Sequence, residues 1–232
     1  MQKNIKISIY IFLIGLSSIL LSSCLFDKDL KQDAHIATFR YNMLKVVDSI
    51  SNGKERINAY NTILSEIEND KALITQRKKN NLIIECYLYI GAELFNQKKY
   101  SKSIDQYNKA MEIDSTNAAV YYYRGTVYDT RLEIDKAYED YNKAIKYNPE
   151  FADAYYNRGI INENKGQYEE ALNDYNKALK LKPLYISDVY TNRGNIYQQL
   201  KKPDKALEDY NKAIEADSTN AVAYCNRGNM LV

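Results

Sequence analysis

The chain has 232 residues, 45% of them hydrophobic and 27% charged, and its 32 basic and 30 acidic side chains give a net charge of +2. These values predict an ordered globular protein and argue against a basic nucleic-acid-binding surface. With one histidine, His35, and no glycine-rich phosphate loop, the sequence offers no histidine-based metal site or Ser-His-Asp arrangement, so we expect no metal, no cofactor and no catalysis.

The N-terminus has the pattern of a secretory signal peptide. Lys3 and Lys6 precede a long apolar run that closes with Leu-Ser-Ser-Cys at 21–24. This closing sequence resembles the lipobox of bacterial lipoproteins, which are cleaved before the cysteine, and it implies that Cys24 becomes a lipid-anchored first residue. An uncleaved transmembrane helix is the alternative, because residues 7–26 carry no charge and about 20 apolar residues can span a bilayer.

Lipidation at Cys24 predicts a location in the bacterial cell envelope, facing the periplasm or exposed at the surface. Removing residues 1–23, with their two lysines, from the 32 basic residues leaves 30 against 30 acidic ones. The mature chain is then neutral, which again argues against nucleic acid as a partner. The sequence leaves open whether the inner or the outer membrane holds the anchor.

Residues 24–32 are predicted to form a short tether and residues 33–83 a helical segment without well-formed repeats. Asn52-Gly53 indicates a turn between two helices. After this turn apolar residues recur at helical spacing, and Tyr60 is followed by asparagine as in the repeats further along, so the segment is a candidate degenerate repeat.

The rest of the chain is repetitive. The tetrapeptide Tyr-Asn-Lys-Ala occurs four times at intervals of 34, 34 and 35 residues, and an Arg-Gly pair recurs 17 or 18 residues after each start. The tetrapeptides begin at Tyr107, Tyr141, Tyr175 and Tyr210, and the pairs at Arg124, Arg158, Arg193 and Arg227. A period of this length indicates a stacked solenoid, in which each unit buries its apolar face against its neighbours.

One unit, residues 118–151, shows two elements. Two apolar stripes have helical spacing, one with Tyr121, Gly125 and Tyr128 and one with Ala137, Tyr141 and Ala144. Pro149 follows the second stripe, where it cannot continue a helix. The unit is therefore predicted to be a pair of short amphipathic helices.

This order of aromatic, glycine, alanine and proline landmarks resembles the tetratricopeptide repeat, with arginine where that family usually has leucine. The resemblance covers about two thirds of the chain, in the units 84–117, 118–151, 152–186 and 187–220 and a partial unit, 221–232. It implies an all-α fold, namely a right-handed superhelical solenoid of helix-turn-helix repeats.

A glycine recurs inside each predicted first helix, although glycine costs about 1 kcal/mol relative to alanine there. The five positions are Gly91, Gly125, Gly159, Gly194 and Gly228. We expect a close approach of the second helix at this site.

An arginine on the first helix and an aspartate on the second vary together. The predicted pairs are Arg124 with Asp140, Arg158 with Asp174, and Arg193 with Asp209, whereas the first unit has Ile90 with Gln106. We expect a charge-assisted contact that fixes the register of the two helices. Ligand binding by these arginines is the alternative.

In the tetratricopeptide family the first helices line a concave groove, and an asparagine two residues before the glycine forms a ladder along a bound peptide in some members. The matching residues are Asn157, Asn192 and Asn226, with Tyr122 and Tyr156 adding contact area. The family's lysine clamp for acidic tails is missing and the predicted groove is mildly acidic, which favours a basic or neutral segment. The alternative is that the asparagines only bond neighbouring helices.

The resemblance thus implies a non-enzymatic, membrane-tethered adaptor that binds a protein or peptide partner in its groove. The partial unit at 221–232 lacks the usual second helix, so the alternative is a structural protein that self-associates through this open end. Residues 27–83 offer His35 and scattered carboxylates without the spacing of a catalytic site.

Overall fold

The computed structural model describes residues 28–70 and 75–230, with side chains from Gln32 onward. The signal peptide and Cys24 lie outside these residues. Two compact units, divided between Ala137 and Tyr138, are described one at a time. In the described part of the chain, no helix is long and apolar enough to cross a membrane.

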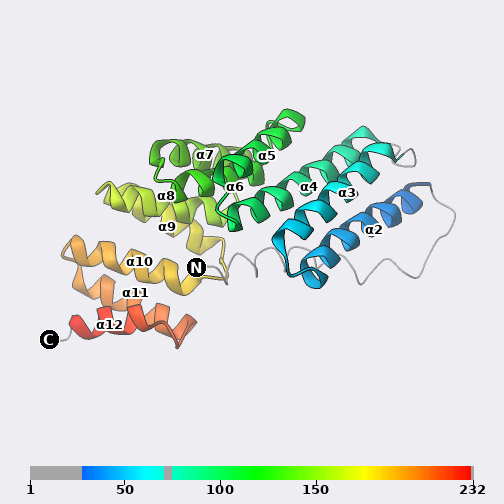
Figure 1. Cartoon of the computed structure of the whole chain (residues 1–232). Helices are drawn as coiled ribbons and strands as arrows, with labels where there is room; N and C mark the ends of the chain where they lie inside the picture. Colours follow the sequence, from blue (N-terminus) through cyan, green and yellow to red (C-terminus); the bar gives the residue numbers. More distant parts are fainter. Residues whose placement is uncertain (1–27, 71–74, 231–232) are drawn as a thin grey trace. The chain divides into compact units, whose positions relative to one another are not determined.

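The N-terminal unit, residues 28–137, is built of helices in succession (Figure 1). They are α2 (Lys28–Ser49), α3 (Gly53–Asn69), α4 (Gln76–Asn96), α5 (Tyr100–Ile113) and α6 (Ala118–Thr130), followed by α7 (Ile134–Tyr147), which runs across the division between the units.

The C-terminal unit, residues 138–230, continues this pattern with shorter helices (Figure 1). They are α8 (Ala152–Asn164), α9 (Tyr168–Lys180), α10 (Ile186–Gln199), α11 (Pro203–Ala216) and α12 (Ala221–Asn229). The described residues contain no strand, so the fold is all-α, a solenoid of helix-turn-helix pairs. Pro203 opens α11, a position where its missing N–H has no helical partner to lose.

The first helix pair forms the turn predicted at Asn52 but begins earlier than the sequence suggested. Asn52 caps α3, and its side-chain oxygen accepts a hydrogen bond of 2.9 Å from the backbone N–H of Lys54. The predicted tether over 24–32 is wrong for its last residues, because α2 already starts at Lys28 and Gln32 is buried. No glycine or proline interrupts the helix there, and Ile36 continues its buried stripe.

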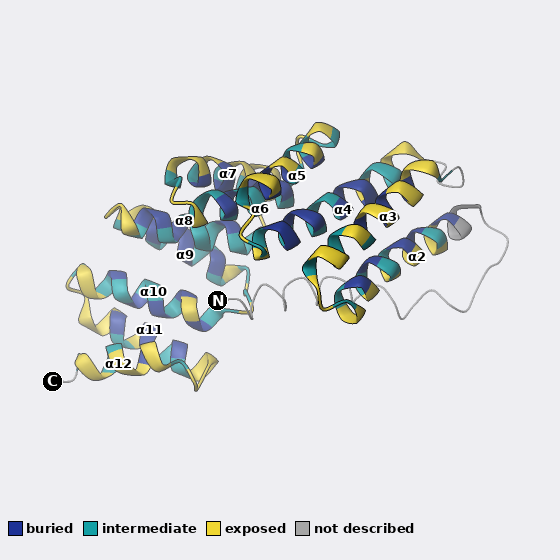
Figure 2. Cartoon of the chain, viewed as in Figure 1, coloured by how far each residue is buried: buried dark blue, intermediate teal, exposed yellow. Residues whose placement is uncertain are grey.

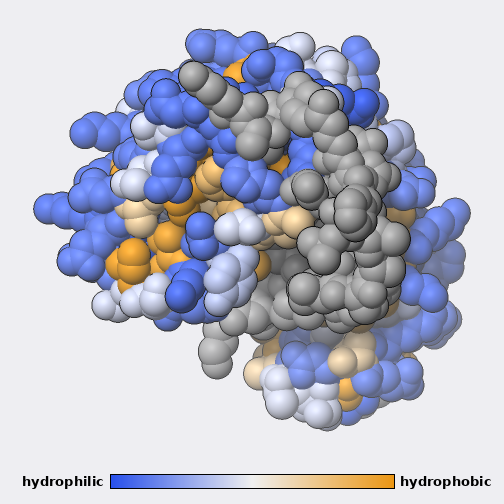
Figure 3. Space-filling view, turned by 90° about the vertical axis from the view of Figure 1, so that its right-hand side faces the viewer, coloured by the Kyte–Doolittle hydropathy of each residue, from blue (hydrophilic) through white to orange (hydrophobic). Residues whose placement is uncertain are grey.

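The buried residues of the described chain lie mainly on helix faces that meet other helices (Figure 2). In the N-terminal unit the largest cluster joins α2, α3 and α4 and consists mostly of large side chains, among them Phe39, Met43, Ile67 and Leu82. Viewed from the right-hand side of Figure 1, the described surface is mostly hydrophilic, with apolar side chains exposed in separate patches (Figure 3).

Three of the recurring glycines, Gly91, Gly159 and Gly194, lie against the tyrosine of the tetrapeptide. A Cβ on Gly159 would lie 2.7 Å from a ring carbon of Tyr175, and one on Gly194 would lie 2.7 Å from Tyr210. In the N-terminal unit a Cβ on Gly91 would lie 2.4 Å from the ring of Tyr107. Real Cβ atoms do not come this close, so glycine lets the tyrosine helix approach, as the sequence predicted.

The lysine and the alanine of the tetrapeptide also have fixed places. The lysine ammonium lies over a tyrosine ring of the first helix in the same pair, 5.8 Å from its centroid for Lys109 over Tyr87 and 5.9 Å for Lys212 over Tyr190. The alanines, Ala110, Ala178 and Ala213, are fully buried. Tyrosine, lysine and alanine of the motif thus all serve helix pairing.

The turns inside the pairs share one backbone geometry. Four first helices, α4, α6, α8 and α10, are each followed by a residue with left-handed φ, at 60° for Lys98, 61° for Leu132, 73° for Gly166 and 55° for Lys201. The next residue donates its N–H back into the helix, for example from Gln167 to the carbonyl of Asn162 at 2.9 Å. Only one of the four positions is glycine, the residue that adopts this φ without strain.

Two cysteines lie within the described residues, and both have free thiols. Cys86 is buried, with its Sγ 3.5 Å from the Sδ of Met43. Cys225, on α12, is exposed and is therefore not a packing residue.

Candidate functional site

The three asparagines of the predicted ladder lie on the first helices of the C-terminal unit and bond to its other helices. The Nδ2 of Asn157 donates to the hydroxyl of Tyr141 at 3.3 Å, and the Nδ2 of Asn192 donates to the hydroxyl of Tyr156 at 3.2 Å. The Nδ2 of Asn226 donates to the Oδ1 of Asn195 at 2.8 Å.

These bonds agree with the structural alternative for the three asparagines. Each bond uses one N–H of a side-chain amide that carries two. Peptide binding by the same amides therefore stays a prediction.

Tyr156 of α8 lies between two other aromatic rings. Its centroid is 4.9 Å from that of Tyr185, at an interplanar angle of 42°, and 6.0 Å from that of Tyr175. Tyr122, the other predicted contact residue, belongs to the N-terminal unit, where its ring stands edge-on to Tyr123 at 5.3 Å. The structure therefore gives Tyr156 an aromatic surrounding that the sequence did not indicate.

Three carboxylates lie around this group of rings. The hydroxyl of Tyr175 donates to the Oε2 of Glu163 at 2.6 Å, and the carboxylate of Asp153 lies near the hydroxyl of Tyr185. Burial raises the pKa of Asp153, Glu163 and Asp188. Burial, followed by the nearby charge of Asp188, raises the pKa of Tyr156 to about 12.

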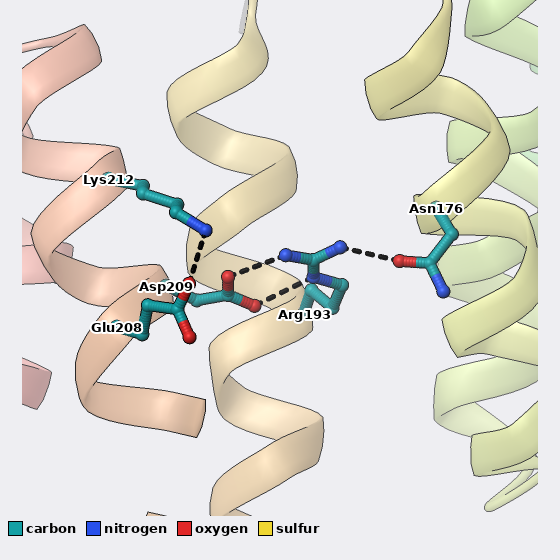
Figure 4. A network of polar contacts seen from close by, with 5 residues as sticks. All are labelled: Asn176, Arg193, Glu208, Asp209 and Lys212. Atoms are coloured by element: carbon teal, nitrogen blue, oxygen red, sulfur yellow. Dashed lines mark hydrogen bonds and ion pairs between the residues drawn. The ribbon is translucent and has the colours of Figure 1, made fainter. Parts of the chain in front are cut away.

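Two of the predicted arginine–aspartate pairs are present in the C-terminal unit. The Nε of Arg158 donates to Asp174 at 2.9 Å and its Nη2 at 2.5 Å, while Arg193 makes the same two bonds to Asp209 at 2.7 and 2.6 Å (Figure 4). Burial alone would lower the pKa of Arg158, but the hydrogen bonds and charge of Asp174 more than offset it, and the pKa is raised.

The pair of Arg124 with Asp140 would join residues on either side of the division between the units. It stays a prediction.

The asparagine of the tetrapeptide is a partner that sequence reasoning missed. The Nη1 of Arg193 donates to the Oδ1 of Asn176, on the second helix of the preceding pair, at 2.5 Å (Figure 4). The same bond recurs in Arg158 with Asn142 at 2.6 Å, Arg124 with Asn108 at 2.7 Å and Arg227 with Asn211 at 2.9 Å.

Each of these arginines therefore bonds to the preceding helix pair. The sequence contained a signal for this bond. Arg227 has its asparagine, Asn211, in the preceding helix pair, although its own partial repeat contains no aspartate.

Comparison with known families agrees with the repeat period. A family model described as tetratricopeptide repeat matches residues 152–185 and 187–220, and a second one, described as TPR repeat, matches residues 91–129 and 133–166. A comparison with curated proteins finds no match.

Many solved structures are similar. A structure of MamA is 25% identical, with a TM-score of 0.58, and the match covers 73% of this chain and 91% of that one. YrrB, described as a TPR protein with an unusual peptide-binding site, is 25% identical over 80% of this chain and 97% of its own, with a TM-score of 0.55. PilF of Pseudomonas aeruginosa is 24% identical over 66% and 69%, with a TM-score of 0.61, and shows the fold alone.

Proposed function

The chain belongs to the tetratricopeptide repeat family, and we propose that it is a membrane-anchored lipoprotein scaffold of the bacterial cell envelope that binds a segment of a partner protein along its first helices. Proteins of such repeats are generally non-catalytic interaction modules, which supports a protein or peptide partner. The peptide-binding site named for YrrB gives a precedent on the same fold.

The observation that carries this proposal is the surface of α8 and α10. Tyr156, Asn157 and Asn192 are all half-buried there, and each side-chain amide keeps an N–H beyond the bond described above. Tyrosine combines a large apolar ring with a polar tip, which suits a protein interface. An extended segment could therefore gain both apolar area and backbone hydrogen bonds along these two helices.

In-cell photocrosslinking tests this binding. A photoreactive residue at Asn192 is compared with one at Lys143, an exposed residue of α7, and the captured proteins are identified by mass spectrometry. We expect one dominant protein from Asn192 and not from Lys143. Equal capture from both positions, or none from Asn192, would contradict a binding surface on the first helices.

The membrane anchor is a separate part of the proposal and rests on the sequence around Cys24. Intact-protein mass spectrometry of the membrane fraction should find a mature chain that begins at Cys24 and carries acyl chains. Cys24→Ser should abolish this modification. An unmodified chain with its first 23 residues retained would favour the transmembrane alternative.

Self-association is a second candidate, supported by the exposed face of α12. Val222 and Tyr224 are 58% and 43% exposed there, and a Cβ on Gly228 would meet no atom within 4 Å. Such a face can be covered by another copy of the chain. A mass that rises with concentration, and that Val222→Asp returns to the monomer value, would support this candidate over the adaptor.

A further inference from the structure

Tyr185 occupies a position where other helices of this protein have a capping asparagine. Asn117 caps α6 and Asn220 caps α12, each by accepting a hydrogen bond from a backbone N–H of the first turn. Tyr185 holds the same place before α10 and makes no such bond. Its ring instead packs against Tyr156, and its hydroxyl lies near the carboxylate of Asp153.

The carboxylates around these rings lack a cation. Within the described residues, Asp153, Glu163 and Asp188 form no ion pair with lysine or arginine. The buried aspartates on the second helices, Asp174 and Asp209, are both paired with arginine. The negative charge beside Tyr156 is therefore not balanced by an ion pair, in contrast to that of Asp174 and Asp209.

Aromatic faces and uncompensated carboxylates attract the same kind of group. A cation is drawn to the electron-rich face of a tyrosine ring, most strongly where water is partly excluded, and to a carboxylate that has no cationic partner. The ring centroids of Tyr156 and Tyr185 lie 4.9 Å apart at an interplanar angle of 42°, so the two rings meet at an angle, and the hydroxyl of Tyr156 accepts a hydrogen bond from Asn192. Electrostatic complementarity thus specifies what the surface fits.

We propose that the surface formed by Tyr156, Tyr185, Asp153, Glu163 and Asp188 recognises a lysine or arginine side chain of the partner segment. This proposal rests on the proposed function, because it names the chemistry of a segment bound along α8 and α10. It predicts a basic partner, and it makes these side chains determinants of specificity rather than of folding.

Selection from a random peptide library tests the chemistry. The full chain in detergent is used to select from a library of ten-residue peptides, beside the double variant Asp153→Asn/Asp188→Asn. We expect lysine and arginine to be enriched at least five-fold over the input with the natural chain, and this enrichment to disappear with the variant. Binding of the selected peptides should weaken as salt is added.

A matched control separates local recognition from net charge. Glu208→Gln removes an exposed carboxylate from α11, where Glu208 pairs with Lys212, and should keep the enrichment. Enrichment of neutral or acidic peptides, no enrichment at all, or unchanged enrichment with the double variant would each overturn the proposal. Whether the first helices bind a partner at all would then be decided separately, by the crosslinking from Asn192.

Stability measurements test whether Asp153 has only a structural role. Burial raises the pKa of Asp153, so its charged form is disfavoured in the folded chain, and any stability it contributes is present in acid and lost as pH rises through the folded-state pKa. Asp153→Asn should therefore fold at least as stably as the natural chain at neutral pH while losing basic peptides. Loss of folding and binding together would overturn the assignment.

Discussion

One repeat position is aromatic in the N-terminal unit and an amide in the C-terminal unit, and both versions contact the tyrosine of a second helix. Tyr89 stacks on Tyr60 with centroids 5.2 Å apart and an angle of 13°. At the same register in the C-terminal unit, Asn157 donates a hydrogen bond to the hydroxyl of Tyr141. The same repeat position can therefore join successive helix pairs through an apolar or a polar contact.

The first pair differs from the repeated ones at two further positions. Leu44 precedes Tyr60 by 16 residues, the spacing at which Gly194 precedes Tyr210. Met43 stands where the later units have arginine, and it is buried against Cys86. This pair fills its interior with side-chain volume, whereas the repeated pairs depend on a glycine contact and a buried ion pair whose geometry allows few substitutes.

Removing a buried charge should have the largest effect on the C-terminal unit. The side chains of Arg193 and Asp209 are 15% and 2% exposed, so Asp209→Ala leaves a buried guanidinium without its carboxylate. We expect a loss of about 3–5 kcal/mol in the free energy of unfolding, measured in urea by far-UV circular dichroism.

Two other carboxylates serve as controls for Asp209. Glu85→Ala in the N-terminal unit should cost no more than about 1 kcal/mol, because its pair with Arg40 is 27% and 37% exposed. Glu208→Ala should leave the urea midpoint unchanged, because its pair with Lys212 is exposed. Equal losses from Asp209→Ala and Glu85→Ala would remove this difference between the units.

The glycine contact should have the next largest effect. Gly194→Ala places a Cβ 2.7 Å from the ring of Tyr210, and the overpacking should cost about 2 kcal/mol, measured in the same way. Gly228→Ala is the matched control, because its Cβ would meet no atom within 4 Å and alanine is the better helix former. A Gly194→Ala chain as stable as the natural one would show that the two helices can separate freely.

Tyrosine hydroxyls should show effects of opposite sign in the two units. The buried hydroxyl of Tyr60 has no hydrogen-bond partner in the described chain, whereas that of Tyr210 bonds to Asn195 at 3.0 Å and Gln198 at 3.1 Å. Tyr60→Phe should therefore leave stability unchanged or raise it, and Tyr210→Phe should lower it by about 1 kcal/mol. Losses of equal size would mean that Tyr60 is bonded in solution.

Much of the fold was predictable because many of its contacts lie within a single helix-turn-helix repeat. The period gave the helix pairs, and the joint occurrence of Arg158 with Asp174 gave their contact. The role of Asn176 was missed because its partner, Arg193, lies in the next repeat. Only a comparison of neighbouring repeats would reveal this bond.

The departures were harder to predict because each residue is atypical for its position. Tyr185 replaces a capping asparagine, so no capping rule points to its contact with the ring of Tyr156. Gln32 is a polar residue that is buried, which hid the start of α2. For Tyr185, the contact that decides the position is made with α8, a helix that the local sequence does not identify.

The turns provide the smallest effect and a direct comparison of the two units. Leu132 has a φ of 61° and is 81% exposed, so its side chain gains little from packing while its backbone is strained. Leu132→Gly should stabilise the N-terminal unit by about 0.5–1 kcal/mol in urea unfolding. Gly166 has a φ of 73° at the same repeat position, and Gly166→Ala should destabilise the C-terminal unit by a similar amount. If Leu132→Gly were also destabilising, the extra freedom that glycine gives the unfolded chain would outweigh the relief of backbone strain. The pairing of the helices, and not the turn residue, would then set the shared turn geometry.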